Sequence, residues 1–414
     1  MKILFLVHRY PHPPNRGDRI RSFHFLEYLS RLGEVTLGTL YEEPPSEESR
    51  AVTASLCREV IACPWRKYRK WRRAGMSLLC GKTMTEGLFY DRELRNRLKR
   101  LAKERHFDVI IVFCSSMFQY VDIFTKNQRK SGENVPAAPR VIVDLVDVDS
   151  QKWFDYAKVA RIPARWLFLT EGKRLRRLET KIDASAERLL VVTPEEAEVY
   201  RGFHPAGKIT AVRNGVDTKF FDPDLPELSA VPEIPYRCVF VGALDYRANV
   251  DGVLWFLKEV WPAVREQFPE AEFDIVGSNP VSALRRAAET VPGANLVGGV
   301  PDVRPYLKRA AVVVIALRIA RGIQNKVLEG LAMRRPVVAS RQSAEGIEAA
   351  SGKELMVCDL PGEWINTISS LFKNEILRYK TGYLGREFVE NHYAWEACLA
   401  PLENLLIKKE KEEP

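Results

Sequence analysis

The segment 311–340 constrains the fold of this chain more than any other part of the sequence. It begins with the apolar run AVVVIAL, which is short and bounded enough to be a buried parallel strand. A loop follows at 318–322, then an amphipathic helix around 324–334, and then a second buried strand, PVVAS. This order predicts a strand–loop–helix–strand unit. Its loop would lie at the carboxyl end of a strand, where open α/β sheets bind ligands.

Polar residues in this unit indicate a site for an anion. Gly322 would let a bound group approach the backbone, and free N–H groups at the start of a helix attract anions. Asn325, Lys326 and Glu329 are spaced by three and four residues, so they share one helix face. A cation near the helix N-terminus and a carboxylate one turn later would suit a diphosphate joined to a ribose. An ordinary βαβ unit with a solvated charged face is the alternative.

Length and composition predict two α/β domains. A chain of 414 residues can bury two sizeable cores, and 46% hydrophobic residues exclude global disorder. A proline-rich segment at 217–235 has the composition of a linker, so we expect the chain to divide near residue 215. Each half is predicted to form a doubly wound parallel sheet. The expected strands are 2–7, 34–40, 108–113, 140–148, 188–193, 208–213, 236–242, 272–277, 295–300, 311–317 and 336–340.

The sequence favours a cytoplasmic protein without a metal site. No apolar run approaches the ~20 residues of a membrane-spanning helix, and the N-terminal MKILFLV is typical of a first strand rather than a signal peptide. The seven cysteines are scattered and form no C-x-x-C pair, which suggests a reducing compartment. The six histidines do not cluster with cysteines or acids at ligand spacing. We therefore expect no bound metal and no other cofactor.

A basic cluster at 65–73 indicates an anionic partner. Lys and Arg fill the positions between Trp65, Tyr68 and Trp71, and the net charge of the chain is +9. Aromatic rings at headgroup level with cations on anionic lipid would make this a patch for the inner face of the plasma membrane. A solvated helix surface is the alternative. Nucleic acid requires similar chemistry, but no nucleic-acid-binding motif lies nearby, so we expect no nucleic acid partner.

A run of acids at 144–149 interrupts an expected strand. Unpaired carboxylates are costly to bury, so Asp144, Asp147 and Asp149 should lie at the carboxyl end of the strand or have partners. Asp149 with Ser150 could instead cap the helix that follows.

Residues 321–340 resemble the nucleotide-sugar site of the family-4 retaining glycosyltransferases, which have the GT-B fold. Their signature is a glutamate, seven residues and a second glutamate, with a glycine directly after the first acid. Glu329 matches the second acid, which in the family holds the nucleotide ribose, and Arg321 stands where the first acid would contact the transferred sugar. The segments NRGDRIRSFH, DLVDVDSQKW and GIQNKVLE together most resemble the sugar transferases associated with PEP-CTERM/exosortase and exopolysaccharide loci.

The resemblance implies a division of the chain. Two Rossmann-like domains would face each other across a cleft, with residues 1–214 on the acceptor side and 215–387 binding the nucleotide sugar. RNGVDTKFF at 213–221 resembles the family's entry into the second domain. A terminal helix at 388–414 would cross back onto the first domain.

The resemblance also implies a donor site at the strand ends of the second domain. VFVGAL at 239–244 looks like the family's glycine loop, but Ala243 replaces the usual arginine, which leaves Arg247 and Lys326 as the cations for the diphosphate. Asn249 is expected to cap a helix at 250–260. The donor residues implied are Gly242, Arg247, Gly277, Val300, Gly322, Asn325, Lys326 and Glu329.

In the first domain, the proline-rich loop with Gly17 resembles the family's flexible glycine loop. The resemblance assigns Gly17, Asp18, Arg21 and Arg321 to the donor sugar or the acceptor, while Asp18 as a helix cap and Arg21 as a merely exposed residue are the alternatives. Asp147 would be a general base or electrostatic stabiliser at the strand end. Lys326 and Arg247 would stabilise the leaving diphosphate.

The activity implied is retaining, metal-independent hexosyl transfer in exopolysaccharide biosynthesis. The donor would be a UDP- or GDP-sugar, and the acceptor a growing glycan or a polyprenyl-diphosphate-linked one. A UDP-sugar 2-epimerase uses the same fold and is one alternative. A nucleotide-binding module without transferase activity is another, because Arg321 replaces an acid of the signature.

Overall fold

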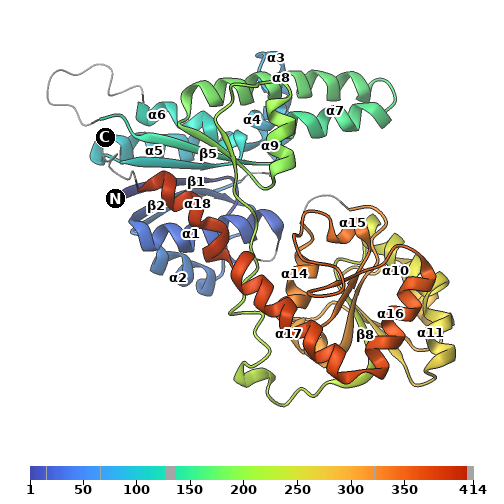
Figure 1. Cartoon of the computed structure of the whole chain (residues 1–414). Coiled ribbons are helices and arrows are strands. Elements are labelled where there is room, and N and C mark those ends of the chain that lie inside the picture. The colour runs from blue at the N-terminus through green and yellow to red at the C-terminus, as the bar shows by residue number, and fades with distance from the viewer. Residues whose placement is uncertain (15, 66, 126–136, 321–322, 408–414) are drawn as a thin grey trace. The chain divides into compact units, whose positions relative to one another are not determined.

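A computed structural model describes residues 1–14, 16–65, 67–125, 137–320 and 323–407. The chain forms two compact units (Figure 1). Unit 1 contains residues 1–213 together with the segment that begins at Leu399, and unit 2 contains residues 214–398. Among the described residues, no helix combines the length and the hydrophobicity that a membrane span requires.

Unit 1 is built on a parallel sheet with the strand order β3-β2-β1-β4-β5-β6-β7. Its central strands are continuous apolar runs, such as KILFLV and VIIVF, because helices cover both faces of the sheet. Leu4 and Leu6 of β1 pack in one core with Leu94 and Leu98 of α5, and α1 lies on the opposite face (Figure 1). The strands are β1 (Lys2–Val7), β2 (Glu34–Tyr41), β3 (Glu59–Pro64), β4 (Val109–Phe113), β5 (Arg140–Val146), β6 (Arg188–Val191) and β7 (Ile209–Ala211).

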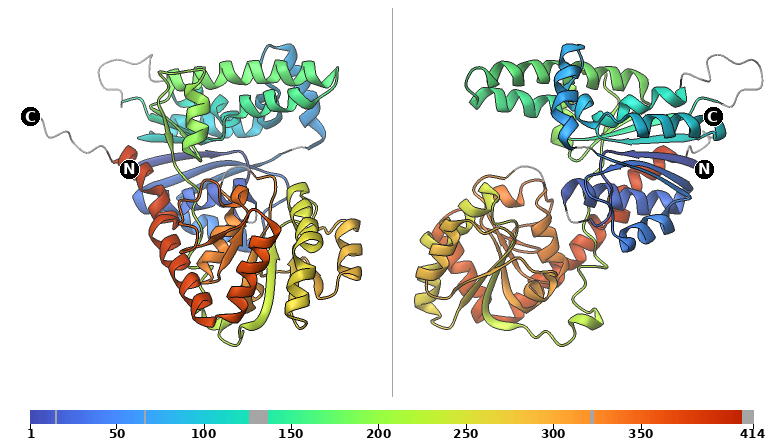
Figure 2. Two further views of the ribbon diagram at one scale, coloured as in Figure 1. Left: turned by 45° about the vertical axis from the view of Figure 1, so that its right-hand side comes forward. Right: turned by 180° about the vertical axis from the view of Figure 1, so that it is seen from behind.

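The helices of unit 1 follow the strands in the alternating order of a doubly wound fold. They are α1 (Gly17–Leu32), α2 (Glu47–Leu56), α3 (Lys67–Leu79), α4 (Met84–Phe89), α5 (Arg92–Glu104), η1 (Ser115–Tyr120), α6 (Asp122–Thr125), α7 (Asp149–Val159), α8 (Ala164–Ser185), α9 (Pro194–Arg201) and α18 (Trp395–Leu406). Helices α7 and α8 form a long antiparallel pair, seen in both views of Figure 2.

Unit 2 contains a second parallel sheet with the order β10-β9-β8-β11-β12-β13. The sheet order changes direction at β8 and β11, which makes their carboxyl ends the expected ligand-binding edge. The strands are β8 (Ile234–Val241), β9 (Glu272–Val276), β10 (Ala294–Gly298), β11 (Ala310–Ile315), β12 (Val337–Ala339) and β13 (Met356–Val357). The helices are η3 (Pro226–Leu228), α10 (Arg247–Glu259), α11 (Trp261–Gln267), α12 (Ser282–Thr290), α13 (Arg304–Arg309), α14 (Asn325–Ala332), α15 (Arg341–Ala344), α16 (Pro361–Lys373) and α17 (Glu375–His392).

The predicted α/β class with two doubly wound parallel sheets is confirmed. Each of the expected strands forms, within a few residues of its predicted bounds. The sequence analysis missed β3 and β13, each of which lies at one edge of its sheet. These two strands lack the continuous apolar run of a central strand: β3 reads EVIACP, and β13 has only two residues.

Unit 2 extends to Cys398, about ten residues beyond the expected return of the chain to unit 1 at residue 388. Val389 and Tyr393 lie in the core of unit 2, and the Val216 N–H donates to the Tyr393 carbonyl over 2.7 Å. Burial of these side chains keeps 388–398 in unit 2, and the chain enters unit 1 only at Leu399. There, the Tyr28 hydroxyl of α1 donates to Glu403 of α18.

Candidate functional site

The start of α14, at the carboxyl edge of the unit 2 sheet, brings together a cation, a carboxylate and an amide. The Lys326 ammonium donates to Asn249 Oδ1 over 2.9 Å, and Asn249 Nδ2 donates to the Ala243 carbonyl over 2.8 Å. The buried Asn249 side chain thus connects α14 to the loop after β8. Glu329 lies one turn beyond Lys326 on the same helix.

Asn249 is not the helix cap that we predicted. Helix α10 already begins at Arg247, so Asn249 lies in its first turn, and its side chain points inward to Ala243 and Lys326 instead of capping the helix end. Sequence reasoning missed its positioning role, because Lys326 lies far along the chain.

Burial controls the charges of this site. It lowers the pKa of Lys326 to about 8, against the attraction of Glu329, and it raises the pKa of Glu329 to about 7, against the attraction of Lys326. Both charged forms are therefore poorly solvated without a ligand. A diphosphate would compensate Lys326, and a carboxylate at Glu329 can accept hydrogen bonds from two adjacent hydroxyls.

The loops after β8 and β9 meet at two glycines. The Gly242 N–H donates to Val276 over 3.0 Å, and a Cβ on Gly277 would lie 1.8 Å from the Gly242 carbonyl oxygen. Close packing of the two loops thus explains Gly277 without a ligand. A Cβ on Gly242 would lie 2.9 Å from Asn249 Nδ2, so this glycine makes room for the amide that holds Lys326. Val300 is half-buried and packs against the core of unit 2.

Two exposed arginines, Arg247 and Arg318, lie near the carboxyl edge of the unit 2 sheet. Arg247 is exposed at the first position of α10. Arg318, in the loop after β11, donates from Nε to Asp251 of α10 over 2.9 Å, which ties that loop to the helix. Arg321 and Gly322, which the sequence analysis assigned to the sugar and the donor, lie outside the described residues.

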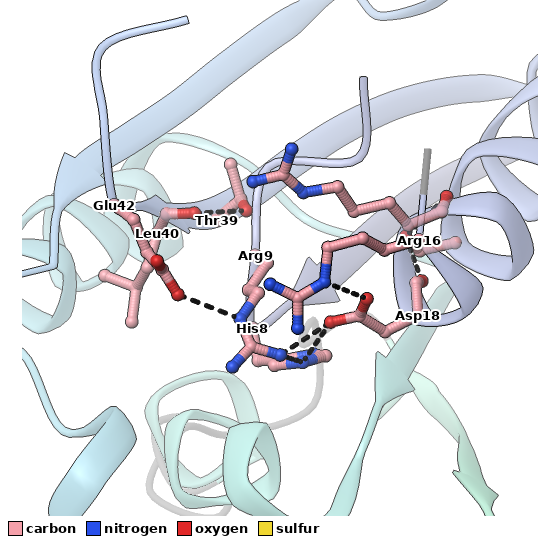
Figure 3. A network of polar contacts seen from close by, with 9 residues as sticks. His8, Arg9, Arg16, Asp18, Thr39, Leu40 and Glu42 are labelled. Atoms are coloured by element: carbon pink, nitrogen blue, oxygen red, sulfur yellow. Dashed lines mark hydrogen bonds and ion pairs between the residues drawn. The ribbon is translucent and has the colours of Figure 1, made fainter. Parts of the chain in front are cut away.

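At the carboxyl edge of the unit 1 sheet, Asp18 is the centre of a polar network (Figure 3). Its carboxylate accepts from Arg9 Nη1 over 2.6 Å and lies 3.4 Å from His8 Nε2 and 3.7 Å from Arg16 Nε. Burial alone would raise the pKa of Asp18, but hydrogen bonds from His8 and Arg9 hold it well below its usual value. Asp18 is therefore an ion-paired anion in the first turn of α1. The alternative, a helix cap, is wrong, because Arg16 occupies the cap position.

Arg9 and His8 lie at the carboxyl edge of the unit 1 sheet, and the sequence analysis did not identify them. Arg9 Nε also donates to Glu42 over 3.3 Å (Figure 3). The Arg9 guanidinium lies 5.6 Å from the centre of the Phe89 ring. His8 stacks on Phe113, and burial lowers the pKa of His8. The signal was their position directly after the first strand, where ligand-contacting residues gather.

Arg21 is a buried partner and not an exposed residue. Its side chain is 1% exposed, and Nε and Nη2 donate to the two carboxylate oxygens of Asp144 over 2.7 and 3.1 Å. Nη1 donates to the Val212 carbonyl over 2.8 Å. The predicted sugar contact by Arg21 does not fit this geometry, because the guanidinium already compensates a buried charge. Gly17 is exposed, with open space where a Cβ would stand.

The remaining acids of the run lie beyond the end of β5, as predicted for carboxylates that avoid unpaired burial. Lys152 donates to Asp147 over 2.6 Å and lies 3.7 Å from Asp149, to which Ser115 also donates over 3.3 Å. Burial raises the pKa of Asp149. The alternative, in which Asp149 and Ser150 cap the next helix, is wrong, because Val148 occupies the cap position. The Ser150 N–H and hydroxyl instead donate to Glu179 of α8 over 2.9 and 2.6 Å.

The basic cluster is only partly a surface patch. Trp65 is buried, stacks on Phe89 at 5.2 Å, and donates from Nε1 to the Leu88 carbonyl over 2.8 Å. It therefore cannot serve as a membrane anchor, because its ring belongs to the packing of unit 1. The side chains of 66–70 lie outside the described part of the chain, whereas Trp71 is 68% exposed.

Comparison with known proteins connects both sheets to one architecture. The whole chain is similar in structure to sucrose-phosphate synthase from Thermosynechococcus elongatus, with 98% of each chain covered, a TM-score of 0.65 and 17% identity. It is also similar to HepE of Anabaena in complex with UDP, with 98% and 99% covered, a TM-score of 0.64 and 11% identity. The fold is GT-B. This confirms the predicted fold class at the level of the two-sheet architecture.

Two sequence matches lie on this GT-B chain. Residues 235–374, which include the start of α14, match the family model of the group 1 glycosyl transferases. An uncharacterized 44.6 kDa protein in the cps region of Klebsiella pneumoniae is 22% identical over 401 residues, covering 95% of this chain and 96% of that protein. The family match supports the predicted glycosyltransferase at this coarser level.

Proposed function

We propose that this GT-B protein is a retaining glycosyltransferase of surface-polysaccharide biosynthesis. It would move a sugar from a nucleoside diphosphate donor to a growing or polyprenyl-diphosphate-linked glycan in the cytoplasm. The proposal rests on one observation: the Asn249–Lys326 pair and Glu329 lie at the start of α14, within the segment that matches group 1 glycosyl transferases. The similar protein from a cps region supports the polysaccharide setting.

The donor is proposed to be a UDP- or GDP-sugar. Structures of the similar HepE contain UDP and UDP-glucose, which supports a nucleotide sugar here. The diphosphate would lie at the N-terminus of α14 beside Lys326, with Arg247 as a second cation, and the ribose would donate to Glu329. These cations would offset the charge of the leaving diphosphate, so we propose that no metal is required.

The acceptor side is proposed to lie at the carboxyl edge of the unit 1 sheet. In a retaining transfer from the leaving-group face, the departing diphosphate takes up the acceptor proton, and polar groups nearby stabilise the developing charges. Asp147, held by Lys152, is our candidate for the stabilising group beside the sugar. The assignments to family 4 and to the exosortase-associated subgroup belong to this proposal.

Isothermal titration with UDP and GDP in EDTA tests the proposal. Glu329→Ala should weaken the preferred nucleotide by about 10–100-fold, because charge-assisted hydrogen bonds to the ribose contribute about 1.5–3 kcal/mol. Glu266→Ala, at an exposed glutamate of α11, has the same charge change and should bind like the wild type. If neither nucleotide binds the wild type at millimolar concentration, the proposed donor is wrong.

A further inference from the structure

We propose that α3 and α5 of unit 1 form a docking surface for an anionic phospholipid membrane, with a lipid phosphate held between the two helices. This inference goes beyond the proposed transfer reaction and does not depend on it, because it uses neither the donor site nor the acids after β5.

Helix α3 presents large apolar side chains to solvent. Trp71, Met76 and Leu79 are 68%, 57% and 90% exposed. At 100° per residue these three positions fall on one face of the helix, whereas Ala74 and Ser77 are buried on the other. We call Trp71, Met76 and Leu79 the α3 apolar face. Apolar side chains grouped on an exposed helix mark a surface that another phase or molecule covers.

A basic cavity of about 490 Å³ lies beside this face, between α3 and α5. Its lining includes Arg72 and Arg73 of α3 and Arg92, Arg97 and Arg100 of α5, with Asp91 and Glu93 as the acids. The α5 residues are spaced by five and three positions, so they also fall on one helix face. Two helices from separate parts of the chain thus direct cations into one hollow.

The two acids of the cavity are already engaged. Glu93 pairs with Arg97 at 2.5 Å, and Asp91 accepts from the Leu94 N–H over 3.0 Å and lies 3.6 Å from Arg73. Within the described part of the chain, no ion pair is found for Arg72, Arg92 or Arg100. Arg72, Arg92 and Arg100 therefore keep their guanidinium groups available for a phosphate, which accepts from several such groups at once.

The neighbouring α3 apolar face favours the phosphate of a membrane lipid over the phosphate of a nucleic acid. Arg72 is exposed on α3 between Trp71 and Met76 in the sequence, so one helix carries both the cation and the apolar groups. A membrane surface matches this combination, because apolar side chains enter the headgroup region while cations meet lipid phosphates. A nucleic acid would contact the arginines but would leave Leu79 and Met76 without an apolar partner.

The surface is held rigidly on unit 1. Arg174 of α8 donates from Nη1 to the Leu78 and Lys82 carbonyls over 2.7 and 2.8 Å, at the end of α3. Glu171 of α8 accepts from the Met84 N–H of α4 over 2.7 Å. Figure 2 shows α3 beside α8 in this arrangement. A fixed helix loses little conformational freedom when it meets a surface.

Flotation of the full-length protein with vesicles tests the inference. We expect the wild type to bind phosphatidylcholine vesicles that contain phosphatidylglycerol, and to bind pure phosphatidylcholine much more weakly. Arg100→Glu should weaken binding by about 25-fold, since each unit of charge near an anionic surface contributes about a factor of five and the reversal changes the charge by two. Lys99→Glu makes the same charge change on α5 outside the cavity lining, and should have the smaller effect.

The apolar half of the surface has its own variant. Leu79→Ser should reduce binding to the same vesicles, whereas Ile376→Ser, at an exposed residue of α17, should not. Circular dichroism on heating checks that all variants remain folded. Equal losses of vesicle binding for Arg100→Glu and Lys99→Glu would contradict a lipid-phosphate site in the cavity. Equal binding to both vesicle types, or Arg100-dependent binding of single-stranded RNA without vesicle binding, would overturn the membrane surface.

Discussion

Asn249 is the residue whose role is clearest from geometry alone. Its amide donates to the Ala243 carbonyl and accepts from Lys326, so it fixes the ammonium relative to the glycine loop. Asn249→Ala should weaken UDP binding by about tenfold, because a hydrogen bond to a charged group contributes about 1.5 kcal/mol. Calorimetric titration measures this.

Asn249→Asp separates positioning from stability. Aspartate keeps an acceptor for Lys326 but cannot donate to the Ala243 carbonyl when ionised. We expect it to retain more of the UDP affinity than alanine while both variants lower the melting temperature. Equal loss of affinity in the two variants would contradict a role for Asn249 through Lys326.

The coupled charges of Lys326 and Glu329 predict a pH optimum for nucleotide binding. The pKa of Glu329 is raised to about 7 and that of Lys326 is lowered to about 8, both by burial. Below about pH 7 the carboxylate becomes protonated, and above about pH 8 the ammonium loses its proton, so UDP affinity should be highest between these values. Titration calorimetry across this range measures it.

Glu329→Gln is the control for the predicted decrease of UDP affinity below about pH 7. Glutamine does not titrate, so the decrease below about pH 7 should shrink while the alkaline decrease remains. The titration of UDP itself is common to both proteins and cancels in the comparison. An unchanged acidic limb in the variant would mean that Glu329 does not control binding.

At this scale the sequence predicted residues that act within one helix but not those that act across the fold. Lys326 and Glu329 were identified because their spacing on α14 is local. The partner of Asp144 was not identified, although the need for one was: Arg21 lies 123 positions earlier in the chain. Only the tertiary fold of unit 1, which places α1 on the sheet that contains β5, brings the two together.

Among the elements, the α7–α8 pair is joined by a carboxyl group of α8 that contacts the start of α7. Glu179 of α8 accepts from the Ser150 N–H and hydroxyl, and burial raises its pKa to about 7. The folded state therefore holds this proton more tightly than the unfolded chain does. Its contribution to stability is full below the ordinary glutamate pKa and is lost as the pH rises through about 7.

Glu179→Gln should remove this pH dependence. A neutral amide can keep both partners at Ser150, so the free energy of unfolding of the variant should gain about 1–3 kcal/mol on the wild type between about pH 5 and pH 8. Urea unfolding at several pH values measures it. Glu195→Gln, at an exposed position of α9, should track the wild type. If the free energies of unfolding of Glu179→Gln and the wild type differed by the same amount at every pH, the raised pKa of Glu179 would be wrong.

The central strands were predictable from the sequence, whereas the edge strands β3 and β13 were not. Strands such as β1 and β11 are buried on both faces, so burial imposes an uninterrupted apolar run. The edge strand β3 has one free side and admits Glu59 and Pro64, which look like loop residues. The end of unit 2 was misplaced for a related reason, because α17 and α18 have similar helical patterns and only tertiary packing separates them.

For the whole molecule, two separate cores predict two unfolding transitions. Each unit has its own buried cluster around its own sheet. The proposed donor residues lie in unit 2, so UDP at about a hundred times its dissociation constant should stabilise that unit by about 2.7 kcal/mol. We expect one calorimetric transition to shift upward by several degrees and the other to stay in place.

Hydrogen exchange assigns the shifted transition. Amides of residues 214–398 should gain protection with UDP, and Glu329→Ala should lose both the protection and the shift. A single transition that moves as one, or protection centred on unit 1, would contradict a donor site confined to unit 2.

The interrupted layout of unit 1 bears on how the chain is made. Its sheet is encoded before residue 214, but the part of α18 from Leu399 onward is encoded after residue 398. In that part, Glu403 accepts from the Tyr28 hydroxyl and the Leu406 carbonyl accepts from Arg140. Every residue of unit 2 is therefore synthesised before the segment of unit 1 that begins at Leu399. The side of α1 around Tyr28 therefore lacks its Glu403 contact until residues beyond 398 have been made.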